Sequence, residues 1–419
     1  MAANGEKFEY VLALGSNVGD REANLKLAIK GISRLGTVKA VSRILETWPI
    51  LIRAQGKFFN QGVLLETAIA PTELLAELLR LEAQIGRIKR IKNGPREIDI
   101  DIAWCSAGIV RTNALRVPHP FNRSREWIRQ IMAELRPDAI DHETGIVYSR
   151  IRGRSVMNIH DFGKKKAAGE KISVVTCYDN VFARLVARTS VDAILVGDSL
   201  GNVIQGNPNT LAVTVDDMVY HARAVRRGAP QAFIVVDLPF MSYQTSVEDA
   251  LRNAGRIVKE TGADAVKLEG GEAVVPQVRA LVTSGVPVMG HLGLTPQSLL
   301  ALGGYKVQGK TNETAKKMIA DAKALEQAGA FAIVLEMVPA ELAKEISAAL
   351  TIPTIGIGAG AGADGQVLVL TDLLGLDPDF TPRFVRKYAE LSGTVLTALE
   401  QYAADVRDGK FPAEKETFH

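Results

Sequence analysis

The N-terminal part of the chain alternates short apolar runs with amphipathic segments. Residues 10–16 form an apolar run that predicts a strand, and apolar side chains recur at helical spacing over 23–36, after Asp20 and before Gly36. The next patterns predict two strands, a helix and a strand, in that order, over 38–47, 57–67, 71–86 and 97–104. The order β, α, β, β, α, β predicts an α+β sandwich of the ferredoxin-like type.

A change of pattern near residue 150 predicts a domain boundary. An amphipathic helix is expected over 125–135, and the polar, basic stretch 148–155 is typical of a linker. Met157 then begins a segment with a different pattern of apolar and polar residues. We therefore expect an N-terminal domain over 1–150, a linker over 151–156 and a second domain over 157–419.

The C-terminal part repeats β-branched runs and Ala-rich helical segments. Eight runs are candidate strands, over 172–179, 193–199, 232–240, 265–271, 286–293, 331–338, 351–360 and 366–372. Eight βα units in a segment of about 250 residues are what a closed barrel requires. The sequence therefore predicts an α/β TIM (β/α)₈ barrel.

Polar residues recur where these predicted strands end. They are Asp179, Asp198, Asp237, Glu269, His291 and Glu336. Because the carboxyl ends of barrel strands meet at one mouth, we expect these side chains to converge there. A scatter of carboxylates without a function would not follow strand ends so regularly.

Individual positions in this set have alternative interpretations. Asp198 and Asp237 suit Mg²⁺, which prefers one or two carboxylates, although each could cap the following helix instead. Lys267 and Glu269 are two apart, so they project on the same side of a strand and could form a buried ion pair or contact a ligand.

The last two positions are a histidine and a carboxylate. His291 follows an apolar run and could be a structural donor or a ligand contact. Glu336 ends a strongly apolar run, a setting that suits a general base.

A second group of chemically active residues lies in the N-terminal part. Asp99 and Asp101 are two apart on a predicted strand, so both carboxylates face one side and could bridge Mg²⁺ ions on a polyphosphate. Cations surround them in the sequence and could neutralise phosphate charge: Arg87, Lys89, Arg90, Lys92, Arg96, His119, Arg123 and Arg125. The alternative is a polar strand edge beside a solvated basic loop.

The composition of the chain excludes several classes of protein. The 419 residues are 47% hydrophobic, which suits two or three folded domains and excludes wholesale disorder. No apolar run is long enough to span a membrane, the start lacks a signal peptide, and two cysteines are too few for a disulfide framework, so we expect a soluble, cytoplasmic protein. Nucleic-acid binding is disfavoured, because aromatic residues are only 6% and none is interleaved with the basic cluster.

The motifs of the C-terminal part resemble those of the ketopantoate hydroxymethyltransferase family. They are VTCYD, VGDSLG, VDLPFMSY, VKLEGGE, GHLGLTPQ, GGYKVQG, VLEMVP and GIGAG, in order along nearly all of 157–419. The resemblance implies transfer of a one-carbon unit from 5,10-methylenetetrahydrofolate to 3-methyl-2-oxobutanoate, which gives 2-dehydropantoate.

The same resemblance implies residue roles and an assembly state. Asp198, Asp237 and Glu269 match the Mg²⁺ site, and Glu336 matches the base. The expected keto acid contacts are Ser199, Lys267 and His291, together with Asp198, Asp237 and Tyr178. The family forms homo-oligomers, so we expect one through the barrel.

The motifs of residues 8–150 resemble 6-hydroxymethyl-7,8-dihydropterin pyrophosphokinase, which transfers pyrophosphate from ATP to a pterin and releases AMP. They are LGSNVGDR, FFNQGV, LEAQIGR, GPREIDIDI and VPHP. By position, Asp99 and Asp101 match its Mg²⁺ ligands. The matching ATP residues are Glu82, Arg87, Lys89, Arg96, His119 and Arg125, and the matching pterin residues are Thr47, Phe58, Asn60 and Trp127.

The sequence therefore predicts a bifunctional biosynthetic enzyme that acts on small molecules. In the main alternative, only the barrel is catalytic and the first domain is a nucleotide-binding or assembly module. A dihydropteroate synthase barrel is disfavoured because the motifs of that family are not evident. Related barrels that form or cleave carbon–carbon bonds beside a Mg²⁺-bound keto acid are a further alternative.

Overall fold

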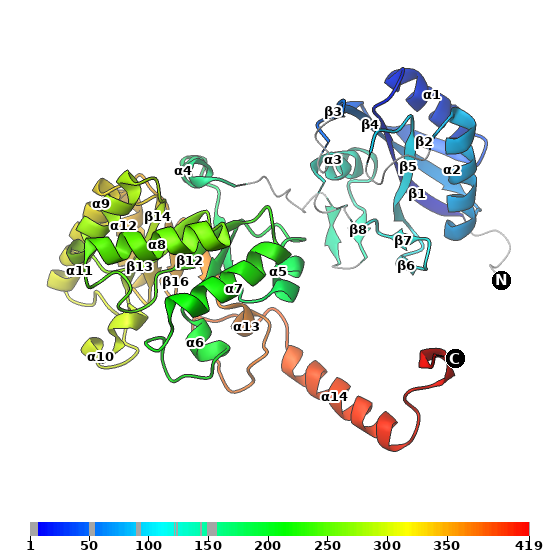
Figure 1. Cartoon of the computed structure of the whole chain (residues 1–419). Coiled ribbons are helices and arrows are strands. Elements are labelled where there is room, and N and C mark those ends of the chain that lie inside the picture. Colours follow the sequence, from blue (N-terminus) through cyan, green and yellow to red (C-terminus); the bar gives the residue numbers. More distant parts are fainter. Residues whose placement is uncertain are drawn as a thin grey trace. The chain divides into compact units, whose positions relative to one another are not determined.

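The chain divides into two compact units, with the division near residue 155 (Figure 1). The computed structural model describes residues 7–49, 55–88, 94–120, 122, 125–142, 145–148 and 157–418. The predicted linker, 151–156, lies outside these residues, and the predicted domain limits stay a prediction.

The first unit is built on an antiparallel sheet of five strands, in the order β2-β4-β1-β5 with β3 also paired to β4. Its main elements are β1 (Phe8–Ser16), α1 (Arg21–Ile32), β2 (Thr37–Val41), β3 (Leu45–Thr47), β4 (Phe58–Thr67), α2 (Pro71–Ile85), β5 (Asp99–Cys105) and α3 (Glu126–Leu135). Two short hairpins are formed by β6 (Val110–Arg111) with β7 (Arg116–Val117) and by β8 (Ile140–Asp141) with β9 (Ile146–Val147).

Strand β1 is buried on both faces, which explains its continuous apolar run. Tyr10, Leu12 and Leu14 pack in one cluster with side chains of α1 and α2. Val11 and Ala13 point to the other face and pack against α3. The sheet is therefore covered by α1 and α2 on one side and by α3 on the other (Figure 1).

Two predicted elements of this unit differ from the structure. The predicted strand 38–47 is split into β2 and β3, because the buried Ser42 side chain takes the N–H of Gly62 and interrupts the ladder with β4. The predicted helix 23–36 begins after the expected cap, Asp20, but ends at Ile32. There the Ser33 hydroxyl donates to the carbonyl of Lys30 and the chain turns before Gly36.

The second unit contains a closed barrel of eight parallel strands, which confirms the predicted barrel. The strands are β10 (Ile172–Thr176), β11 (Ala193–Val196), β12 (Phe233–Asp237), β13 (Ala265–Glu269), β14 (Val288–Gly293), β15 (Ala332–Glu336), β16 (Thr354–Ile357) and β17 (Gly365–Leu368). Each falls within one of the predicted strand segments, except that β17 begins one residue earlier, at Gly365.

The second unit also contains helices, most of which surround the barrel, whereas the last one in the chain projects away from it (Figure 1). They are α4 (Ile159–Ala167), α5 (Asn180–Val186), α6 (Leu200–Val203), α7 (Val215–Gly228), α8 (Val247–Thr261), α9 (Val275–Thr283), α10 (Leu299–Leu302), α11 (Asn312–Gln327), α12 (Ala340–Ala349), α13 (Leu370–Leu373) and α14 (Leu391–Arg407), with the 3₁₀ turns η2 (Glu272–Val274), η3 (Pro296–Ser298) and η4 (Glu414–Glu416). Among the helices of the described residues, none is both long and apolar enough to cross a membrane.

One βα repeat is incomplete. β16 and β17 are joined directly by a turn, whereas the predicted pattern has a helix after every strand. Gly358 and Gly360 in this turn have φ values of 61° and 75°, a region that favours glycine. A Cβ on Gly360 would lie 2.6 Å from the Cβ of Ala340, so the glycine also permits close packing on α12.

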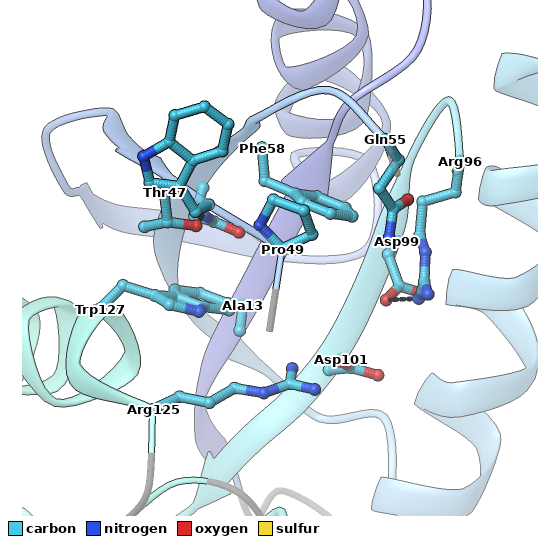
Figure 2. Close-up of a pocket in the computed structure, with 13 residues that line it drawn as sticks. Ala13, Thr47, Pro49, Gln55, Phe58, Arg96, Asp99, Asp101, Arg125 and Trp127 are labelled. Carbon is cyan, nitrogen blue, oxygen red and sulfur yellow. Dashed lines mark hydrogen bonds and ion pairs between the residues drawn. The ribbon is translucent and has the colours of Figure 1, made fainter. Parts of the chain in front are cut away.

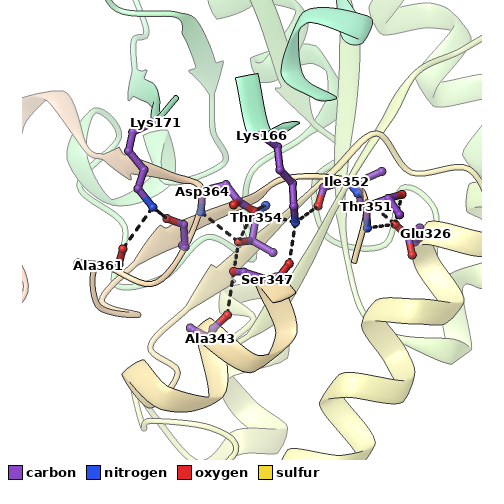
Figure 3. Close-up of polar contacts among 11 residues, drawn as sticks. Lys166, Lys171, Glu326, Ala343, Ser347, Thr351, Ile352, Thr354, Ala361 and Asp364 are labelled. Carbon is purple, nitrogen blue, oxygen red and sulfur yellow. Dashed lines mark hydrogen bonds and ion pairs between the residues drawn. The ribbon is translucent and has the colours of Figure 1, made fainter. Parts of the chain in front are cut away.

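The amino end of the barrel is closed by α4 and by a group of polar contacts (Figure 3). Phe162 of α4 is fully buried and its ring lies 5.1 Å from those of Phe233 and Phe331. Lys166 donates to two backbone carbonyls and lies 3.0 Å from Asp364. These contacts fix the end of the barrel opposite the predicted active site.

Candidate active sites

A cavity of about 740 Å³ opens at the carboxyl ends of the barrel strands. Its lining includes five of the strand-end residues singled out in the sequence: Asp198, Asp237, Glu269, His291 and Glu336. The sixth, Asp179, is not among the lining residues. Its carboxylate accepts the N–H of Phe182 at 2.9 Å and caps α5, which is a structural role.

Lys267 and Asp237 form a buried ion pair with 3.1 Å between Nζ and Oδ1. Lys267, on β13, therefore pairs with an aspartate of the neighbouring strand β12. The alternative ion pair between Lys267 and Glu269 is not formed among the described residues. The other oxygen of Asp237 accepts the N–H of Asp198 at 3.0 Å. Burial raises the pKa of Asp237 despite Lys267, and burial together with Asp237 and Glu269 raises the pKa of Asp198 well above its usual range.

His291 connects three charged side chains. Its Nδ1 lies 3.4 Å from Glu269 Oε1 and 3.2 Å from Lys267 Nζ, and its Nε2 lies 3.3 Å from Glu336 Oε2. Burial and Lys267 oppose protonation of the ring, but Glu269 and Glu336 outweigh them and raise the pKa of His291 to about 9. The ring thus lies between Glu269 and Glu336 and holds the carboxylate of Glu336 at the mouth of the cavity.

Ser199 lies in the cavity wall, and Tyr178 lies behind it. Their hydroxyl oxygens are 2.8 Å apart, so Tyr178 fixes the Ser199 side chain while not itself lining the cavity. Gly197 makes room for this arrangement, because a Cβ there would lie 2.8 Å from Ser199 Oγ.

The backbone is strained directly after Glu336. Met337 has φ 46°, which is uncommon for a residue with a side chain. Its N–H and C=O are both bonded, to Ile357 O and Gln308 N. Strained residues held by their surroundings are typical of functional sites.

Two buried residues that sequence reasoning did not single out organise the acidic cluster. Gln297 donates from Nε2 to Asp198 Oδ2 at 2.8 Å and from its backbone N–H to Glu269 Oε2 at 3.0 Å. The Tyr243 hydroxyl donates to Gln297 Oε1 at 2.8 Å. Gln297 ends the motif GHLGLTPQ and Tyr243 ends the motif VDLPFMSY. Their polar side chains inside these motifs were the signal that could have identified them from the sequence.

The first unit has its own pocket, lined by residues of β1, β3, β4, β5 and the start of α3 (Figure 2). Thr47, Phe58, Asn60 and Trp127, the predicted pterin residues, all line it. Figure 2 shows the rings of Phe58 and Trp127 facing the pocket from different elements. Asn60 Nδ2 donates to Thr47 Oγ1 at 2.8 Å, which orients the amide.

The two aspartates of β5 also line this pocket and point to the same side. Asp99 is held between two guanidinium groups, with Arg87 Nη2 at 2.8 Å and Arg96 Nη1 at 2.5 Å. Asp101 is more accessible, with 36% of its side chain exposed, but the surrounding protein and Asp99 raise its pKa. Arg125 lines the pocket and extends toward Asp101.

Of the other predicted ATP residues that the structure describes, Glu82 and His119 do not line the pocket. Glu82 is buried; its carboxylate accepts the N–H of Ile100 at 2.6 Å and pairs with Arg87, so it reaches Asp99 only through that arginine. His119 Nε2 lies 3.9 Å from Asp101 Oδ2, and burial and Arg125 lower the pKa of His119 to about 4. Lys89 lies outside the described residues, as do Arg90, Lys92 and Arg123.

Asn17 is a supporting residue that sequence reasoning did not single out. Its Oδ1 accepts the N–H of Arg96 at 2.8 Å and its own N–H donates to Arg96 O. It lies in the motif LGSNVGDR and holds the loop that carries Arg96.

Neither site contains a preformed metal cage. Within the described ranges, no group of three or more His, Cys, Asp or Glu side chains has the arrangement of a metal site. Mg²⁺ does not require one, because it usually binds through one or two carboxylates together with water and substrate oxygens. Asp237 Oδ1 and Glu269 Oε1 are buried and accept no hydrogen bond among the described residues. Each lies near one nitrogen, Lys267 Nζ at 3.1 Å and His291 Nδ1 at 3.4 Å, and such acidic oxygens also fit a bound cation.

Comparison with known proteins identifies the C-terminal part. The profile of the ketopantoate hydroxymethyltransferase family matches residues 156–414. The chain belongs to this family. The 3-methyl-2-oxobutanoate hydroxymethyltransferase of Moorella thermoacetica is 56% identical over 265 residues, 63% of this chain and 98% of that protein. The enzyme of the same name from Leptospira interrogans is 54% identical over 263 residues, 62% and 99% of the two chains.

Two further matches complete the comparison. The profile of 7,8-dihydro-6-hydroxymethylpterin-pyrophosphokinase matches residues 11–137, so the ketopantoate hydroxymethyltransferase part follows a second enzyme domain. A crystal structure of 2,3-dimethylmalate lyase, a PEP mutase/isocitrate lyase superfamily member, aligns with 62% of this chain and 91% of its own at 16% identity and a TM-score of 0.41, too distant to inform function. The predicted resemblances and the predicted enzyme classes, a hydroxymethyltransferase and a diphosphotransferase, are confirmed.

Proposed function

We propose that the barrel transfers the one-carbon unit of 5,10-methylenetetrahydrofolate to 3-methyl-2-oxobutanoate and releases 2-dehydropantoate and tetrahydrofolate. One water is consumed, because the methylene carbon becomes a CH₂OH group. The observation that carries the proposal is the convergence of Asp198, Asp237, Lys267, His291 and Glu336 on one cavity in a chain that belongs to this family.

The carboxylates of Asp198 and Asp237, with Glu269 nearby, would hold Mg²⁺. The raised pKa values of the two aspartates reflect buried negative charge that Lys267 offsets only in part, and this supports a second cation. When bound, Mg²⁺ would supply Lewis acidity to the keto and carboxylate oxygens of the substrate.

The protein's own side chains would bind the keto acid and move its proton. Lys267 and Ser199 would contact its polar oxygens, and Tyr178 would keep Ser199 in place. Glu336 would take the proton from C3, since His291 Nε2 lies 3.3 Å from its carboxylate and holds it at the mouth of the cavity. The resulting carbanion equivalent then attacks the methylene carbon of the folate.

Two assays of the full chain test this proposal. In D₂O with Mg²⁺ and no folate, the enzyme should exchange the C3 hydrogen of 3-methyl-2-oxobutanoate, and addition of 5,10-methylenetetrahydrofolate should yield 2-dehydropantoate. EDTA should abolish both, and Glu336→Gln should slow both by roughly 100-fold or more. Exchange that persists in Glu336→Gln would assign the base to another residue.

For the first unit, we propose pyrophosphoryl transfer from ATP to the hydroxymethyl group of 6-hydroxymethyl-7,8-dihydropterin, with release of AMP, on a ferredoxin-like sandwich. Asp99 and Asp101 would hold Mg²⁺, and the pterin would lie between Phe58 and Trp127. The ATP phosphates would be bound by Arg87, Lys89, Arg96 and Arg125, with Glu82 and His119 in support. Asp99 pairs with Arg87 and Arg96, and this supports the proposal. When ATP and Mg²⁺ bind, the two arginines would pair with phosphate oxygens and the carboxylate of Asp99 would pair with the metal ion.

The predicted homo-oligomer and the cytoplasmic location stay predictions. Helix α14 buries none of its residues within the described chain and exposes Leu396, Leu399 and Tyr402, which supports self-association of the second unit. Light scattering of the full chain would give the assembly state.

A further inference from the structure

The cavity at the barrel mouth is much larger than a five-carbon keto acid. Its volume of about 740 Å³ lies in the range that encloses a drug-sized ligand. Beyond the acidic cluster, its wall continues over Tyr305 and over a largely apolar segment after β17 that includes Leu376, Phe380 and Phe384. The wall therefore provides a surface for a second, flat and partly apolar molecule.

Asp372 is the unusual residue of this outer wall. It lies on α13, lines the cavity and is only 7% exposed. Its carboxylate accepts one long hydrogen bond, from Thr371 Oγ1 at 3.3 Å, and among the described residues no cation pairs with it. Burial, opposed by Thr371, raises its pKa. The three other cavity aspartates differ: Asp198 accepts from Gln297, Asp237 pairs with Lys267, and Asp377 is exposed and accepts the N–H of Asp379.

A buried carboxylate with so few donors is costly unless a ligand supplies them. Thr210 also lines the cavity; it is 2% exposed and its hydroxyl has no hydrogen-bond partner among the described residues. Asp372 lines the cavity together with Thr371, Asp377 and the apolar side chains of Leu376, Phe380 and Phe384. The ligand should therefore combine a flat apolar body with adjacent N–H donors on one edge.

We propose that Asp372 binds the pterin ring of the folate donor, by accepting hydrogen bonds from the 2-amino group and from N3–H. These two donors are adjacent and parallel on the ring, which matches the two oxygens of one carboxylate. Phe380, Phe384 and Tyr305 would contact the ring faces. The inference rests on the proposed use of a reduced folate, and it adds the residue that recognises the pterin.

The test separates the folate from the keto acid. Asp372→Ala and the isosteric Asp372→Asn would be compared with the wild-type full chain and with Asp379→Ala, which removes an exposed carboxylate that does not line the cavity. Calorimetry would give the Kd of tetrahydrofolate, steady-state kinetics the KM of the donor, and NMR in D₂O the folate-independent exchange at C3 of the keto acid.

Both Asp372 variants should weaken tetrahydrofolate binding and raise the donor KM on the order of 10- to 100-fold. Exchange at C3 should stay within about twofold of wild type, and Asp379→Ala should change nothing. Tetrahydrofolate affinity within threefold of wild type would overturn the inference, as would loss of C3 exchange in both variants. If wild-type enzyme neither binds tetrahydrofolate nor uses the donor, the proposed function itself fails, which is a different result.

Discussion

The side-chain amide of Gln297 donates to Asp198 Oδ2 at 2.8 Å and so connects the turn after β14 to the end of β11. The backbone N–H of the same residue donates to Glu269 Oε2. One residue thus orients two acidic side chains that come from different strands of the barrel.

Replacement of Gln297 should disturb the metal site more than the fold. We expect Gln297→Leu to lower Mg²⁺ affinity and the rate of C3 exchange by roughly 10- to 100-fold, the usual effect of removing a partner that orients a metal ligand. Titration with Mn²⁺ followed by electron paramagnetic resonance would measure the affinity directly. Gln327→Leu, on the exposed face of α11, is the matched control. Unchanged Mn²⁺ affinity in Gln297→Leu would show that Gln297 has no positioning role.

A methyl group at Gly197 should displace Ser199. The added Cβ of Gly197→Ala would lie 2.8 Å from Ser199 Oγ and 3.5 Å from Asp237 Oδ2. We expect the KM of the keto acid to rise about tenfold or more, the effect of about 1.4 kcal/mol of lost binding. Gly163→Ala, where no atom lies within 4 Å of the added Cβ, should leave the KM unchanged. An equal KM in the two variants would argue against keto acid binding by Ser199.

Glu326 should make the barrel unit sensitive to acid. Its Oε1 accepts from the N–H and hydroxyl of Thr351 and from the N–H of Ile352 (Figure 3). Partial burial opposes ionisation, but these bonds lower the pKa of Glu326 below its ordinary value of 4.5. A folded-state pKa below the unfolded one gives stability that is present above about pH 4.5 and is lost as the pH falls through the folded value.

We therefore expect Glu326→Gln to lower the free energy of unfolding by about 1 kcal/mol at pH 7, with the difference from wild type shrinking below pH 4. Urea denaturation of the full chain, followed through the barrel transition at both pH values, would measure this. Glu345→Gln, on an exposed position of α12, should have no such effect. A difference that is the same at both pH values would contradict the role of the charge.

Phe58 and Trp127 should determine pterin affinity. We expect Trp127→Ala and Phe58→Ala each to raise the pterin Kd by roughly tenfold, because aromatic contacts and burial are lost together. ATP affinity should change little. Phe59→Leu is the control, since Phe59 points to the other face of β4, under the guanidinium of Arg21. Pterin binding that survives in both alanine variants would place the ring elsewhere.

The sequence predicted the barrel well because its strands are short β-branched runs, and five of them carry a cavity residue at or near their carboxyl ends. It failed where a side chain competes with the backbone pattern, as at Ser42, which splits a strand, and Ser33, which ends α1 early. Asp179 has the same sequence context as Asp198 but caps a helix, a difference that only the structure reveals. Gln297 contacts Asp198 from a distant segment, and Asp372 reaches the cavity through the folding of α13, neither of which spacing along the chain encodes.

The central claim is that one chain carries two independent active sites. The most direct test measures two products in one preparation of the full chain: AMP from ATP and Mg²⁺ with and without 6-hydroxymethyl-7,8-dihydropterin, and 2-dehydropantoate from the keto acid and the folate donor. Asp99→Asn should abolish pterin-dependent AMP and spare 2-dehydropantoate, whereas Glu336→Gln should do the reverse. Absence of pterin-dependent AMP in active wild-type enzyme, or loss of both products in either variant, would contradict the claim.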